Sequence, residues 1–259
     1  MLCQNGLYES EHKSKYTSIY FDLVLKEVRS SIRIEDEEDR FGLGQAIMNV
    51  ITQSGPTVVS QKSSRRDKFI ANKIFRPMSE IITTIWSIEN IAVYVRTFPH
   101  KRQKVSRLSY LRYHIENYLN EIYILQTRLI SYLNTLEKAY RKSEQGPKIS
   151  EIIEPLCTFI YSSLNSYNAA RGSHVHVTRF SDEEIDRLST LDLLSTGDDD
   201  FGNLMKNIFL SSYRAARKKW ADKILRDSIE INKLLDVYFE VLTKVLFKDE
   251  RLIIPENYK

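Results

Sequence analysis

Apolar residues recur every three or four positions along most of the chain, which is the period of an α-helix with one buried face. The longest such stripe runs from Leu108 to Leu136. The pattern predicts helices over about 15–34, 77–97, 102–142, 150–171, 181–194 and 201–247, with a further short helix over 41–51. The connections between the long helices are short, which favours antiparallel neighbours.

Turn-forming residues are scarce, with eight Gly and six Pro in 259 residues. We therefore predict an all-α fold, an antiparallel up-and-down helical bundle with an additional N-terminal helical segment. The stretch 53–67 contains Gly55, Pro56 and several Ser and basic residues, which are typical of a linker. The predicted division is 1–66 for the N-terminal helical segment and linker and 67–259 for the bundle. Ser181 and Glu184 have the spacing of a helix-starting capping box.

Composition narrows the class of protein only a little. The chain is 42% hydrophobic and 28% charged with a formal net charge of +4, which is ordinary for a globular protein and permits a nucleic-acid partner. No apolar run is long enough to span a bilayer and none at the start has the form of a signal peptide, so we expect no membrane partner and a cytoplasmic protein. The acidic runs 35–39 and 198–200 lack calcium-loop spacing, and no cofactor-binding glycine motif occurs. We therefore expect neither a metal nor a cofactor.

The chemistry-bearing segment is Asn168–Val177, where the helix over 150–171 is expected to end. Arg171 and His176 are separated by four residues, with Ser173 and His174 between them. Cleavage of RNA without metal needs a group that moves protons near neutral pH and a fixed cation for charge that develops on the phosphate. Histidine and arginine have these properties.

An Arg, four to six residues and then a His near the end of a helix in a small bundle resembles the HEPN motif (higher eukaryotes and prokaryotes nucleotide-binding). The resemblance covers residues 75–247. It implies a metal-independent endoribonuclease that leaves a 2′,3′-cyclic phosphate, with Arg171 and His176 catalytic and Ser173 or His174 auxiliary. It also implies a homodimer with a composite site, a toxin or antiviral defence role, and a neutralising or regulatory protein partner. Where the family often has Asn, Asp or His after the Arg, this chain has Gly172.

Two further features leave alternatives open. Arg214, Arg217 and Lys218 share a predicted helix face, which either tracks an RNA backbone or is a solvated face with Asp222 and Asp227 as partners. Arg107 and His114 also match the spacing, on a helix whose apolar stripe favours a partly buried bundle histidine over a cleft-lining one. The rival functions are a non-catalytic helical module that binds RNA, a nucleotide or a protein, and a structural dimerisation bundle.

Overall fold

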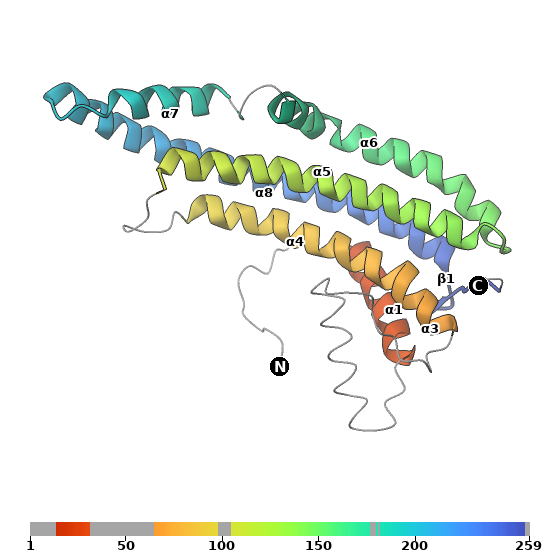
Figure 1. The fold of residues 1–259 in the computed structure, drawn as a ribbon. Coiled ribbons are helices and arrows are strands. Elements are labelled where there is room, and N and C mark those ends of the chain that lie inside the picture. Colours follow the sequence, from red (N-terminus) through yellow and green to blue (C-terminus); the bar gives the residue numbers. More distant parts are fainter. Residues whose placement is uncertain (1–13, 32–64, 98–104, 177–179, 181, 257–259) are drawn as a thin grey trace. The chain divides into compact units, whose positions relative to one another are not determined.

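The computed structural model describes residues 14–31, 65–97, 105–176, 180 and 182–256, and for 31 and 168–176 it describes the backbone alone. Helices dominate this part of the chain (Figure 1). The helices are α1 (Lys15–Ser31), α3 (Arg65–Phe69), the π-helix η1 (Ile70–Phe75), α4 (Arg76–Arg96), α5 (Arg107–Tyr140), α6 (Gly146–His176), α7 (Glu183–Leu194) and α8 (Asp200–Leu246). Two short strands follow, β1 (Phe247–Lys248) and β2 (Arg251–Leu252).

The predicted all-α helical bundle is confirmed, and the differences lie at helix ends. The helix predicted to begin near residue 150 begins earlier, at Gly146 and Pro147, because proline fits the first turn of a helix, where the N–H groups have no partner within the helix. The expected end near Arg171 is wrong, since α6 continues to His176. The last residues of the predicted linker, 65–67, already belong to α3. The predicted helix over 41–51 lies outside the described residues.

The chain divides into two compact units, each assembled from distant segments. Unit 1 comprises Met1–Ile81, Arg128–Thr158 and Asn232–Lys259, and unit 2 comprises Ile82–Thr127 and Phe159–Ile231. The predicted boundary after residue 66 stays a prediction about domain organisation. The helices α4, α5, α6 and α8 each contribute residues to both units.

Unit 1 has an aromatic core to which α1, α5 and α8 contribute. The hydroxyls of Tyr20 in α1 and Tyr132 in α5 lie 2.5 Å apart, and Tyr238 in α8 donates to the Leu129 carbonyl at 2.9 Å. All three tyrosine side chains are fully buried. Burial raises the pKa of Tyr20, so its hydroxyl stays protonated and able to donate in this core.

Unit 2 has the predicted up-and-down order, with one complication. The Tyr110 hydroxyl near the start of α5 donates to the Tyr94 carbonyl near the end of α4, so these two helices are antiparallel. Next in the chain, α6 and α7 both pack beside α5 and run antiparallel to it. The Tyr118 hydroxyl in α5 donates to Asp227 in α8, and α8 runs in the same direction as α5. The third segment of the bundle is therefore described as two helices, α6 ending at His176 and α7 beginning at Glu183.

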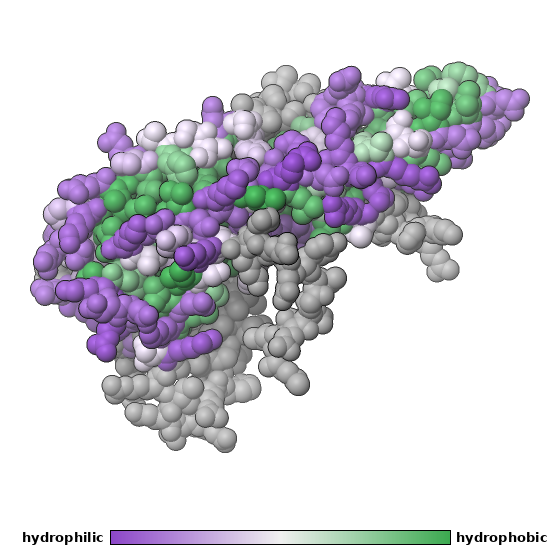
Figure 2. All heavy atoms as spheres, turned by 180° about the vertical axis from the view of Figure 1, so that it is seen from behind, coloured by the Kyte–Doolittle hydropathy of each residue, from purple (hydrophilic) through white to green (hydrophobic). Residues whose placement is uncertain are grey.

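Two surface features complete the description. The exposed large hydrophobic side chains among the described residues include Leu193, Leu194, Phe201 and Leu204, near the turn between α7 and α8. Figure 2 shows hydrophobic colour gathered at that end of unit 2. Among the helices described, none is both long and apolar enough to cross a bilayer.

Candidate functional site

The predicted motif lies in the last two turns of α6. Arg171, Ser173, His174 and His176 all have helical backbone, and their side chains lie outside the described residues. In an α-helix, positions five apart are rotated by about 140° around the axis and positions three apart by about 60°. Because the helix continues, the backbone of His174 lies on nearly the same side of α6 as Arg171, whereas the backbone of His176 lies farther around the helix.

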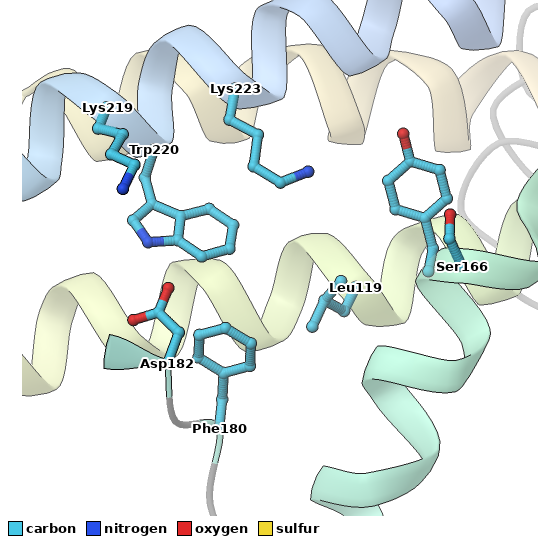
Figure 3. A pocket seen from close by; sticks show the side chains of 8 residues that line it. Leu119, Ser166, Phe180, Asp182, Lys219, Trp220 and Lys223 are labelled. Carbon is cyan, nitrogen blue, oxygen red and sulfur yellow. The ribbon is translucent and has the colours of Figure 1, made fainter. Parts of the chain in front are cut away.

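A cavity of about 460 Å³ opens in unit 2 beside α5, α6 and α8 (Figure 3). Three aromatic rings, two lysines, a hydroxyl, a carboxylate and a leucine surround it. The lining residues among those described are Leu119, Ser166, Tyr167, Phe180, Asp182, Lys219, Trp220 and Lys223. Such a lining, with a few polar groups among apolar ones, is typical of small-molecule sites.

Hydrogen bonds and ring contacts hold Phe180 and Asp182, the described residues between α6 and α7, at this cavity. The Phe180 backbone N–H donates to Oε1 of Glu116 at 3.2 Å, and the Phe180 ring meets the edge of Trp220 with ring centres 5.5 Å apart. Asp182 begins α7, because its Oδ1 accepts from the N–H of Ile185 at 2.8 Å. This aspartate, and not the predicted Ser181, is the N-cap; Ser181 itself lies outside the described residues.

Carboxylates hold both lysines of the cavity. Lys223 lies 2.6 Å from Oδ2 of Asp227, which also accepts from the Tyr118 hydroxyl at 2.7 Å. Lys219 lies 2.5 Å from Oε1 of Glu184, and this hydrogen bond raises the pKa of Lys219. The positive charge in the cavity is therefore already compensated.

The Lys223 ammonium also bridges two aromatic rings. Its Nζ lies 5.5 Å from the centre of Tyr167 and 5.9 Å from that of Trp220, within cation–π range of both. Burial, and next the charge of Asp227, raise the pKa of Tyr167 to about 12, so the phenol is neutral at physiological pH. Figure 3 shows Lys223 reaching from α8 across the space between Trp220 and Ser166, with Leu119 on the opposite side.

The motif segment and the cavity are linked through the chain. Tyr167 lines the cavity and precedes Arg171 by four residues, which is one helical turn, or about 6 Å along α6. Phe180 lines it again four residues after His176. Cavity-lining residues thus flank the predicted catalytic residues on both sides in the sequence.

The predicted basic face of α8 is only partly continuous. Arg214 and Lys218 are exposed, and neither has a hydrogen-bond or ion-pair partner among the residues that the structure describes. Arg217 instead donates to the Arg96 carbonyl at 2.6 Å and lies over the Tyr213 ring. Asp222 pairs with Arg96 at 2.8 Å rather than with the predicted basic face.

His114 is a half-buried bundle histidine, as the apolar stripe of its helix favoured. The rings of Tyr94, Tyr110 and Tyr113 surround it, with centres between 4.4 and 5.5 Å away. Its Nδ1 is buried without a partner in the described part of the chain, and burial lowers its pKa. No cluster of three His, Cys, Asp or Glu suited to a metal occurs among the described residues.

Comparison with known proteins gave no relatives: no family model, no curated protein and no solved structure matches the chain. Function is therefore inferred from the motif residues and from the cavity. The sequence did not identify Tyr167 or Trp220 as candidate site residues, although both line the cavity. Their spacing carried no such signal, because Tyr167 and Trp220 are 53 residues apart in the chain and lie on different helices.

Proposed function

We propose that this chain is a HEPN-like, metal-independent endoribonuclease in which Arg171 and His176 are the catalytic pair. The observation that carries the proposal is the flanking of this pair by cavity-lining residues, Tyr167 before it and Phe180 after it. A cavity with aromatic rings and amines, lined by residues that flank the Arg–His pair in the sequence, would combine a place for a nucleotide with the groups that cleavage requires.

The chemistry is transesterification within one nucleotide unit. The ribose 2′-OH attacks the adjacent phosphorus, the bond to the 5′ oxygen of the next nucleotide breaks, and a 2′,3′-cyclic phosphate remains. His176 takes part in moving the proton, and Arg171 balances the charge on the phosphate oxygens with a planar guanidinium that stays ionised. Ser173 and His174 have auxiliary roles, and Arg214, Arg217 and Lys218 bind the RNA backbone. No cofactor enters this reaction.

The test is incubation of purified protein with mixed cellular RNA in EDTA. We expect cleavage with 2′,3′-cyclic phosphate ends, and we expect Arg171→Ala or His176→Ala to lower the rate by about 10²-fold or more. Arg171→Lys should stay impaired, because an ammonium does not reproduce the two-pronged contact with phosphate. Wild-type cleavage by His176→Ala, or loss of activity in EDTA, contradicts the mechanism.

His174→Ala is the informative companion variant. Because α6 continues through His176, the backbone of His174 lies closer to the helix side of Arg171 than the backbone of His176 does. A small effect of His174→Ala beside a large effect of His176→Ala supports the assigned roles. The reverse order would move the proton-transfer role to His174.

We further propose that the enzyme acts as a homodimer, since one Arg–His pair is half of a family-type composite site. The apolar surface for this association should lie next to α6 and its motif, so that the two Arg–His pairs meet. Light scattering that finds only monomers at micromolar concentration, with and without RNA, opposes the dimer. If RNA binds without being cleaved, the alternative of a non-catalytic RNA- or nucleotide-binding module replaces the enzyme.

A further inference from the structure

We propose that the cavity between α5, α6 and α8 binds one unstacked nucleobase of a single-stranded RNA, and that Asp182 selects among the bases. The choice of RNA as the source of the base rests on the proposed function. The cavity itself, its rings and its charges belong to described side chains of unit 2.

The size and lining of the cavity fit a flat aromatic ring. Its volume of about 460 Å³ lies within the range of roughly 300–1,000 Å³ that small-molecule sites have. The half-buried ring of Tyr167 and the remaining exposed edges of Phe180 and Trp220, which are 5% and 7% exposed, line it, and proteins that hold single strands stack bases on aromatic side chains. Leu119 adds an apolar wall.

The charges favour a base over a bare phosphate. Lys223 is paired with Asp227, Lys219 is paired with Glu184, and the carboxylate of Asp182 also lines the cavity. An isolated phosphate would have to compete with these carboxylates for the ammonium groups. A neutral ring does not, and it gains a cation–π contact with Lys223, which already lies near the rings of Tyr167 and Trp220.

Asp182 provides the selection. One of its oxygens accepts the hydrogen bond that starts α7, and an ionised carboxylate has acceptor capacity beyond that single bond. Figure 3 shows this carboxylate beside Trp220 and Phe180. An acceptor at that point favours bases with an exocyclic amino group, adenine, cytosine and guanine, over uracil, whose exocyclic groups are carbonyls that also accept.

Trp220 reports on occupancy of the cavity. The chain has two tryptophans, and the other, Trp86, is 57% exposed, so Trp86→Phe leaves the cavity indole as the single reporter. This variant is titrated with AMP, CMP, GMP and UMP, and with ribose 5-phosphate as the control without a base. We expect saturable fluorescence changes with the nucleotides, with UMP weaker by about tenfold, and no change with ribose 5-phosphate.

Two substitutions in the Trp86→Phe background test the assignment. Tyr167→Ala should weaken nucleotide binding by about tenfold, whereas Tyr161→Ala, an exposed tyrosine of the same helix outside the cavity lining, should not. Asp182→Asn keeps a side chain that caps a helix and adds a donor, so it should abolish the preference against UMP. Equal effects of the two tyrosine substitutions, or equal changes with ribose 5-phosphate and AMP, overturn the proposal.

A short 2′-O-methyl RNA separates this inference from the enzymatic one, because it lacks the hydroxyl that attacks phosphorus. Its binding should be weakened by Tyr167→Ala. Nucleotide binding without any RNA cleavage would support the base site and contradict the proposed ribonuclease activity. If Tyr167→Ala cleaves RNA at an unchanged rate and Trp220 fluorescence does not respond to nucleotides, the base site is contradicted and the ribonuclease proposal is retained.

Discussion

Glu27 connects three elements of unit 1, and its removal should be costly. Its side chain, only 5% exposed in α1, accepts from the Leu252 backbone N–H of β2 at 2.9 Å and pairs with Arg66 of α3. In Glu27→Ala the Leu252 N–H loses this acceptor in a buried setting, and Arg66 loses its counter-charge. The perturbation therefore tests whether α1 holds the end of the chain in place.

The magnitude follows from these two losses. A buried group left without its hydrogen bond costs about 1–3 kcal/mol. The charge loss adds less than the 3–5 kcal/mol known for fully buried pairs, because the Arg66 side chain is 48% exposed and water solvates it. We expect Glu27→Ala to lower the free energy of unfolding by about 2–4 kcal/mol.

The matched control is Glu250→Gln. Glu250 pairs with Lys26, the neighbour of Glu27, at 2.7 Å, but both of these side chains are mostly exposed. Exposed pairs contribute little to stability, so the control should stay near wild type. Urea unfolding followed by circular dichroism measures both. The reasoning fails if Glu27→Ala unfolds within about 0.5 kcal/mol of wild type, or if the two variants lose equal stability.

Three further predictions concern the core, a tight turn and pH. Tyr20→Phe leaves the buried Tyr132 hydroxyl without its partner and should cost about 1–3 kcal/mol, while the double Phe variant should cost less than the two single changes together, as urea unfolding can measure. Gly202→Ala would set a methyl group 2.1 Å from the Gly197 carbonyl oxygen, so we expect a lower melting temperature, whereas the Gly197→Ala methyl meets mainly a movable side chain and should do less. Burial lowers the pKa of His114, so the unfolded chain binds this proton more readily, and stability present above about pH 6.5 is lost as pH falls; His114→Gln should reduce that loss between about pH 7 and pH 5, and an unchanged slope of melting temperature against pH would oppose this.

The candidate site was only partly readable from sequence. The spacing of Arg171 and His176 was visible, because it is local. The cavity was not, because Trp220 and Tyr167 have the spacing of ordinary core residues, and only folding brings them to the same Lys223 ammonium. The end of α6 was also missed, since the helix was expected to end near Arg171 and the backbone stays helical to His176.

The sequence by itself determined the helical class and the approximate extent of each long helix. A period of 3.6 residues in apolar positions is a local property, and the long stripes of α4, α5 and α8 express it without reference to any partner. The same local chemistry placed the end of α7 at Leu194.

Tertiary structure decided which of these helices meet. Nothing in the sequence around α1 indicates that Glu27 accepts a hydrogen bond from the Leu252 N–H, or that the Ser14 hydroxyl donates to Asp236 at 2.5 Å. Both partners lie more than 200 residues further along the chain. The final hairpin is a similar case, because Asp249 and Glu250 both adopt positive φ, which glycine or asparagine would ordinarily signal. Contacts between distant segments depend on how whole faces fit together, and that fit is a property of the folded chain rather than of any stretch of its sequence.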